Sequence, residues 1–173
     1  LARYGIAAIT LVFEDDVPQE IARFERLENL PVHVAVMLDV SASMEPNLLQ
    51  TKAAALAFFE RVITPKDRAA LIVFNDHPLL AVKLTNQTQV LAGGLAGVKA
   101  ERGTSLYDSV VFSLFYFNGV KGQRAIVLLS DGKDEGSRFN FEETLDFARR
   151  AGVAIYPIGL NIPRSDSEVR KVL

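Results

Sequence analysis

The 173-residue sequence contains no cysteine and only two histidines. Without cysteine there is no disulfide scaffold, no thiolate zinc site and no cysteine nucleophile. Neither sign of charge predominates, because the sequence has 19 Lys and Arg and 21 Asp and Glu. This balance disfavours nucleic-acid binding. No apolar run approaches the roughly 20 residues needed to cross a bilayer, so we expect no membrane insertion. Any metal site must use oxygen ligands or the two histidines.

Hydrophobic residues make up 49% of the chain, enough for the core of a single domain of this length. We expect that domain at residues 31–173, preceded by a lead-in segment, residues 1–30, whose residues 9–24 form a β-hairpin. Ser165 and Glu168 have the spacing of a helix capping box near the last residue. The sequence therefore predicts that the fold continues beyond the C-terminus of the chain.

Strands alternate with helices along the chain. Residues 32–38 (VHVAVML) and 125–129 (AIVLL) are continuously apolar, as in strands covered on both faces. The strands at 69–74 and 79–84 are joined too closely for a crossover helix, so one of them is an antiparallel edge strand. A further strand is predicted at 153–158, and helices at 48–63, 87–98, 106–117 and 141–151. This order predicts an α/β fold: a doubly wound, Rossmann-like, mostly parallel sheet with helices on both faces.

Polar side chains follow these strands where ligands bind in such sheets, at the carboxyl ends. Asp39, Ser41 and Ser43 alternate after the first buried strand, so an extended chain would project all three to one side. Thr104 precedes a predicted helix, and Asp131 follows a second buried strand. Three hydroxyls and two carboxylates suit a hard cation, with Mg²⁺ as the first choice and Mn²⁺ as the second. An ion held by neutral hydroxyls stays poorly neutralised and attracts an outside anion, such as a partner's carboxylate.

The combination of D-x-S-x-S after a buried strand, G-T-S before a helix and S-D-G after a later strand resembles the metal-ion-dependent adhesion site of von Willebrand factor A domains. The resemblance runs from about residue 31 to residue 173. It implies that Ser41, Ser43 and Thr104 are hydroxyl ligands and that Asp39 and Asp131 act directly or through water. It also implies a protein partner that offers an Asp or Glu carboxylate to the metal.

Residues 13–21 resemble the lead-in of a bacterial subgroup of these proteins, many of which are exported to the periplasm or the cell exterior. That resemblance is the sole indication of localisation in the sequence. The partner's identity and the oligomeric state stay open.

Two other interpretations remain beside this non-enzymatic, protein-binding module. A Mg²⁺-dependent phosphotransferase or hydrolase could use Asp39 as its nucleophile, although Ser41 stands where an Asp-x-Asp enzyme has its second carboxylate, and neither a P-loop nor a G-x-S-x-G elbow occurs. Alternatively, the site is vestigial and the domain is structural, since each polar residue alone is ordinary in a turn or a helix cap.

Three smaller expectations concern residues near or outside the site. His33 is predicted to be a packed, hydrogen-bonded core residue and His77 a solvated turn residue, so a histidine zinc site is not expected. Asp134 and Glu135 belong to a charged loop that is either simply solvated or forms a rim that selects a partner.

Overall fold

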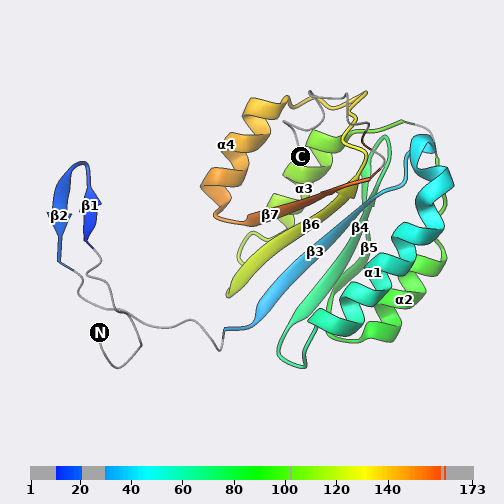
Figure 1. The fold of residues 1–173 in the computed structure, drawn as a ribbon, viewed down its shortest axis with the longest axis horizontal. Coiled ribbons are helices and arrows are strands. Elements are labelled where there is room, and N and C mark those ends of the chain that lie inside the picture. Colours follow the sequence, from blue (N-terminus) through cyan, green and yellow to red (C-terminus); the bar gives the residue numbers. More distant parts are fainter. Residues whose placement is uncertain (1–10, 21–29, 102, 161, 163–173) are drawn as a thin grey trace.

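The computed structural model describes residues 11–20, 30–101, 103–160 and 162. Its main body is a five-stranded sheet in the order β5-β4-β3-β6-β7 (Figure 1). The strands are β3 (Val32–Asp39), β4 (Arg68–Phe74), β5 (Pro78–Thr85), β6 (Gln123–Ser130) and β7 (Ala154–Gly159). The helices are α1 (Leu48–Val62), α2 (Thr88–Ala96), α3 (Leu106–Tyr116) and α4 (Phe141–Ala151), and a 3₁₀ helix, η2 (Ala42–Asn47), precedes α1.

Strand pairing confirms the predicted fold class. β3 lies in the centre and pairs in parallel with β4 on one side and β6 on the other, while β7 continues the parallel pairing beyond β6. β5 pairs antiparallel with β4 at the edge, as the short link between them requires. Figure 1 shows α1 and α2 on one side of the sheet and α3 and α4 on the other.

The alternation of side chains along β3 divides the core into two layers. Val34, Val36 and Leu38 pack on one face with Ala55 and Phe59 of α1. Ala35 and Met37 point to the other face, where the α3 side chains Leu106, Val110 and Leu114 cover them. Because both faces are covered, the strand is apolar throughout, which is the pattern that made it recognisable in the sequence.

Gly94 explains the glycine pair inside α2. A Cβ at this position would lie 2.3 Å from Cγ2 of Val82 in β5 and 3.3 Å from Cδ2 of Leu71 in β4. The glycine weakens the helix in isolation but lets its backbone approach the sheet closely. Close packing thus stabilises a helix that local sequence preference disfavours.

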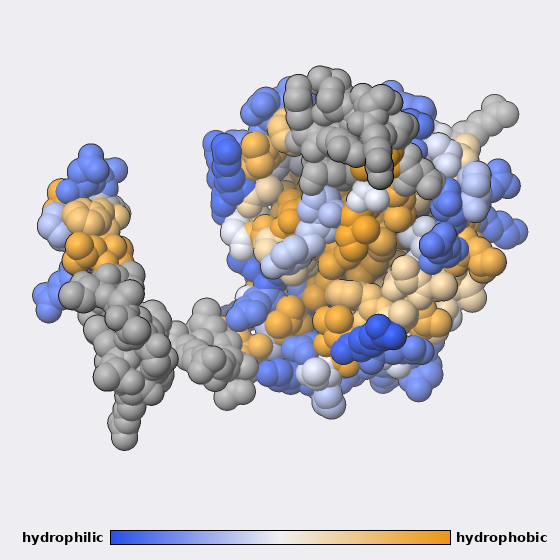
Figure 2. Space-filling view, in the orientation of Figure 1, coloured by the Kyte–Doolittle hydropathy of each residue, from blue (hydrophilic) through white to orange (hydrophobic). Residues whose placement is uncertain are grey.

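In the part of the chain that the structure describes, the sheet face beside α1 is left uncovered over β6 and β7. A groove of about 630 Å³ runs there between Phe58 of α1 and Ala154, Tyr156 and Ile158 of β7. Tyr156 is 59% exposed and Ile158 46%. Figure 2 shows apolar residues gathered over this face.

The predicted N-terminal hairpin is confirmed as β1 (Val12–Glu14) paired antiparallel with β2 (Val17–Gln19). Asp15 and Asp16 form its turn with positive φ, at 49° and 64°. Residues 9–10 and 21–24 of the predicted hairpin lie outside the described residues. The helix predicted from Ser165 also lies outside them, and the boundary at residue 30 stays a prediction. Among the described residues, no helix is long and apolar enough to span a membrane.

Candidate functional site

Asp39 ends the central strand and is fully buried. Its Oδ1 accepts a hydrogen bond from the Ser41 N–H at 2.9 Å, and its Oδ2 accepts one from the Ser130 hydroxyl at 2.6 Å. Ser41 is extended and buried, but η2 begins at the next residue, so the extended geometry predicted as far as Ser43 stops at Ser41. The Ser43 hydroxyl nevertheless lies 3.1 Å from the Ser41 hydroxyl, although Ser43 itself is exposed.

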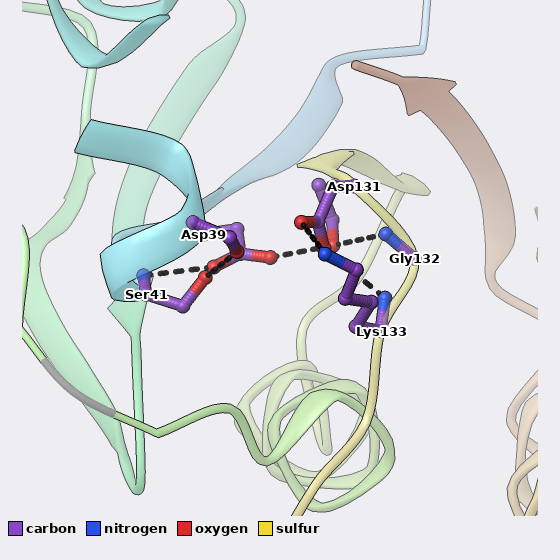
Figure 3. Close-up of polar contacts among 7 residues, drawn as sticks. Asp39, Ser41, Asp131, Gly132 and Lys133 are labelled. Atoms are coloured by element: carbon purple, nitrogen blue, oxygen red, sulfur yellow. Dashed lines mark hydrogen bonds and ion pairs between the residues drawn. The ribbon is translucent and has the colours of Figure 1, made fainter. Parts of the chain in front are cut away.

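Asp131 follows β6 and is 7% exposed. Figure 3 shows its side chain beside that of Asp39, each extending from the end of its own strand. Its Oδ1 accepts a hydrogen bond from the Lys133 N–H at 3.2 Å, and its Oδ2 lies 3.4 Å from Lys133 Nζ. The Lys133 side chain is 55% exposed, so this ion pair is screened by solvent.

Thr104 is buried, and hydrogen bonds to its main-chain carbonyl hold it in place. Its carbonyl accepts hydrogen bonds from the N–H groups of Glu135 at 2.8 Å and Gly136 at 3.1 Å, in the loop that follows Asp131. On the other side, the Glu101 N–H donates to the Val40 carbonyl at 2.8 Å. Backbone hydrogen bonds therefore join all three predicted loops into one surface at the carboxyl edge of the sheet.

Gly103 makes the approach of this middle loop possible. Its φ is +82°, which L side chains rarely adopt, and a Cβ there would overlap the Asp76 carboxylate. The glycine of the G-T-S motif is thus required by backbone geometry.

The surroundings of the Asp39 carboxyl disfavour its negative charge. Burial raises the pKa of the Asp39 carboxyl above its ordinary value, and the negative charge of Asp131 adds to that rise. Hydrogen bonds from Ser130 and Ser41 oppose it but do not reverse it. Two neighbouring buried carboxylates are a place where positive charge lowers the free energy.

The donor set fits a hard divalent cation in its chemistry. Two carboxylates and two hydroxyls belong to side chains that contact or face one another, and the remaining hydroxyl belongs to the adjoining middle loop. Among the described residues, no three His, Cys, Asp or Glu side chains gather closely enough to hold a metal ion. A hydroxyl-rich set with two carboxylates does not depend on such a cluster, and oxygen ligands with few charges are what Mg²⁺ accepts.

Sequence reasoning missed Ser130. The S-D-G motif was noted for its aspartate, yet the fully buried Ser130 hydroxyl bridges the two loops by donating to Asp39 and accepting from the Gly132 N–H at 2.9 Å. The signal available was a polar residue at the last position of a buried apolar strand.

Two further expectations concern histidines and the charged loop. His77 is exposed, as predicted, but the prediction that His33 is hydrogen-bonded in the core is wrong at Nδ1, which is buried without a partner among the described residues. His33 lies near the amino end of β3, away from the site. Asp134 is half-buried and not simply solvated, because its carboxylate accepts from the N–H of Leu106, and its rim role stays a prediction. Glu135 is exposed, and its rim role stays a prediction.

Comparison with known proteins identifies one family. The model of the von Willebrand factor type A domain matches residues 34–133, more than half of the chain, and this range includes all five predicted metal-site residues. The resemblance of residues 13–21 to a bacterial lead-in lies outside the match. No curated protein matches the sequence.

Solved bacterial structures share the fold. Three N-terminal domains of the type V pili tip protein Mfa5 from Porphyromonas gingivalis are 22% identical, with a TM-score of 0.58 over 61% of this chain and 20% of theirs. BatB from Bacteroides thetaiotaomicron is 22% identical, with a TM-score of 0.64 over 74% of this chain and 66% of that one. The pilus adhesin SpaC from Lactobacillus rhamnosus GG is 16% identical, with a TM-score of 0.68 over 84% of this chain and 26% of that one. This chain spans less than two thirds of each, and at these identities the likeness is one of fold.

Proposed function

Because the chain belongs to the von Willebrand factor type A domain family, we propose that it is a protein-binding module that uses a divalent cation, Mg²⁺ or Mn²⁺, to hold an acidic residue of a partner. The observation that carries this proposal is the pair of buried carboxylates, Asp39 and Asp131, at the carboxyl edge of the sheet. A cation lowers the free energy of two adjacent carboxylates removed from water.

The hydroxyls of Ser41, Ser43 and Thr104 would bind the ion, with Asp39 and Asp131 bound directly or through water. Both Asp39 oxygens already accept hydrogen bonds, which favours contact through water at that residue. The metal supplies a positive centre that attracts anionic oxygen. A cation held mainly by neutral hydroxyls retains enough positive charge to attract a carboxylate from outside the protein.

The partner is therefore proposed to be a protein that presents an exposed Asp or Glu. Mfa5 is a pili tip protein and SpaC a pilus adhesin, and an adhesive role for this chain is consistent with its shared fold. Catalysis is the competing function, with Asp39 as the nucleophile of a Mg²⁺-dependent phosphotransferase or hydrolase. The full burial of Asp39 disfavours it, since a nucleophile must reach its substrate.

Thermal unfolding of the parent and of Asp39→Ala, in EDTA and with Mg²⁺, Mn²⁺ or Ca²⁺, tests the proposal. A ligand that binds only the native state stabilises it by about 2.7 kcal/mol at a concentration 100 times Kd. We expect Mg²⁺ or Mn²⁺ to raise the Tm of the parent and not that of the variant. No shift for the parent at millimolar metal would contradict cation binding.

The partner half of the proposal needs a second experiment. Synthetic peptides with one Glu or Asp, each matched by its Gln or Asn version, are tested for binding in Mg²⁺ and in EDTA. We expect binding only for the acidic peptides and only with the metal. Hydrolysis of a generic phosphate ester by the parent, absent in Asp39→Asn, would favour the competing enzyme.

A further inference from the structure

The first turn of α3 takes its hydrogen-bond acceptors from a loop 28 residues further along the chain. The opening N–H groups of a helix lack intrahelical acceptors, and the N-cap side chain usually supplies one. The N-cap residue of α3 makes no such bond. Instead, Asp134 Oδ1 accepts from the N–H of Leu106 at 2.8 Å and of Tyr107 at 3.4 Å. The Ser137 hydroxyl accepts from the N–H of Asp108 at 3.1 Å.

A side chain of α3 also accepts hydrogen bonds from the main chain of this loop. Asp108 Oδ1 accepts from the N–H groups of Arg138 at 2.8 Å and Phe139 at 3.1 Å. Within the loop, the Ser137 hydroxyl donates to Asp134 Oδ1 at 2.6 Å. We call the interlocked side chains of Asp108, Asp134 and Ser137 the α3 latch.

The α3 latch joins the two chain segments that carry the proposed metal ligands Thr104 and Asp131. Thr104 stands two residues before the first residue of α3, and Asp131 stands three residues before Asp134. Two backbone hydrogen bonds, from Glu135 and Gly136 to the Thr104 carbonyl, run beside the latch. These hydrogen bonds fix the position of the loop that carries Asp131 relative to the loop that carries Thr104.

We propose that the α3 latch sets the separation of the Thr104 hydroxyl and the Asp131 carboxylate, and through it the affinity of the site for a divalent cation. This inference rests on the proposed function. Asp134 and Ser137 are positioning residues, because their polar atoms are used on α3. Mg²⁺ demands near-ideal octahedral geometry, and losing a group that orients a ligand typically costs 10- to 100-fold in metal affinity.

A Mn²⁺ titration, with free Mn²⁺ followed by electron paramagnetic resonance, tests the α3 latch. We expect Asp134→Ala to weaken binding at least tenfold and Ser137→Ala to weaken it less. Asp134→Asn, which keeps the Oδ1 acceptor but loses the Oδ2 acceptor of the Ser137 N–H, should lie between the parent and Asp134→Ala. The matched control is Asp67→Ala, which removes another buried carboxylate that accepts backbone N–H bonds, at the opposite end of the sheet. It should lower the Tm and leave Mn²⁺ affinity within twofold of the parent.

The possible outcomes distinguish failure of the α3 latch proposal from failure of the proposed cation-binding function. A parent that binds Mn²⁺, with Asp134→Ala and Ser137→Ala binding equally well, overturns the α3 latch alone. Equal weakening in Asp67→Ala also overturns it, because the effect would then follow stability. A parent that binds no Mn²⁺ overturns the proposed function and this inference together. If Asp134→Ala does not fold, Ser137→Ala, which loses a single hydroxyl, decides the question.

Discussion

Asp39 and Asp67 are both buried aspartates, but they lie at opposite ends of the parallel sheet and differ in their surroundings. Asp67 precedes β4 at the amino end, where its carboxylate accepts from the N–H of Val32 and from the N–H and hydroxyl of Thr64. These bonds, the Thr64 hydroxyl first, lower the pKa of Asp67. Burial beside Asp131 instead raises the pKa of Asp39.

The comparison contrasts a carboxylate whose charge its surroundings stabilise with one whose charge they disfavour. Asp67 joins the strand β3 to the turn before β4, and its charge is stabilised by donors that have no other task. Asp39 also accepts hydrogen bonds, yet its net environment disfavours the charge. Burial alone therefore does not distinguish the two aspartates; the direction of the pKa shift and the second carboxylate near Asp39 do.

The largest expected difference between the two aspartates is in the stability lost when each is replaced by a neutral residue. Asp67→Ala should lower the free energy of unfolding by about 2 to 4 kcal/mol, because it leaves buried donors without an acceptor. Asp39→Asn in EDTA should change it by less than about 1 kcal/mol, because it removes an unfavourable charge while an amide still bonds to Ser41 and Ser130. Urea unfolding measures both, and equal losses would contradict the distinction.

Removing the hydroxyl that bridges the two loops should weaken cation binding. Ser130→Ala takes away a hydrogen bond to a charged group, worth about 1.5 to 3 kcal/mol, so Mn²⁺ affinity should fall about 10- to 100-fold. Ser113→Ala is the control, since this buried serine bonds only within α3, to the Ser109 carbonyl. Unchanged affinity in Ser130→Ala would mean that Ser130 does not support the site.

Low pH tests the contribution to stability of Asp67, the aspartate at the amino end of the sheet. Because the folded pKa of Asp67 is lowered, its contribution to stability is present above the unfolded value of about 3.8 and is lost as the pH falls through the folded pKa. The parent should therefore lose stability below about pH 4 by a component that Asp67→Asn lacks. Urea unfolding at a series of pH values compares the two; identical slopes below pH 4 would count against the assignment.

The smallest effect concerns the exposed lysine beside the site. Lys133→Met removes a positive charge that pairs with Asp131 and repels an incoming cation. Exposed ion pairs contribute at most about 1 kcal/mol, so Mg²⁺ affinity should rise only a few-fold at low salt, and the gain should shrink as salt is added. Isothermal titration calorimetry measures it, and weaker binding in the variant would reverse our interpretation of Lys133.

The sequence predicts elements well where the signals are local. The apolar run in β3 marks a strand covered on both faces, and Asn140 and Glu143 have the capping-box spacing and form that box at the start of α4. At the other end of α4, Gly152 adopts the left-handed conformation expected after a helix. The meeting of Asp39 and Asp131 also follows from the sequence, because carboxyl ends of parallel strands share one edge.

Contacts between distant residues could not be predicted in this way. Ser130 and Asp39 are 91 residues apart, and Asp134 reaches α3 across 28. Nothing in the local composition around Asp134 distinguishes a helix-capping carboxylate from a solvated one, since the acceptor's role depends on a helix elsewhere. The 3₁₀ helix η2, which contains Pro46, likewise has no periodic signal by which the sequence could indicate it.

The central position of β3 has a mechanical consequence. A partner held at the proposed metal site, beside Asp39, and the chain that enters at Val32 would pull on opposite ends of the same strand. The register runs from His33 opposite Arg68 to Asp39 opposite Phe74 on one side, and along the same length of β6 on the other. Tension along β3 would load both hydrogen-bond ladders in shear, so that many bonds must yield together. A strand loaded in this way resists being peeled from its sheet.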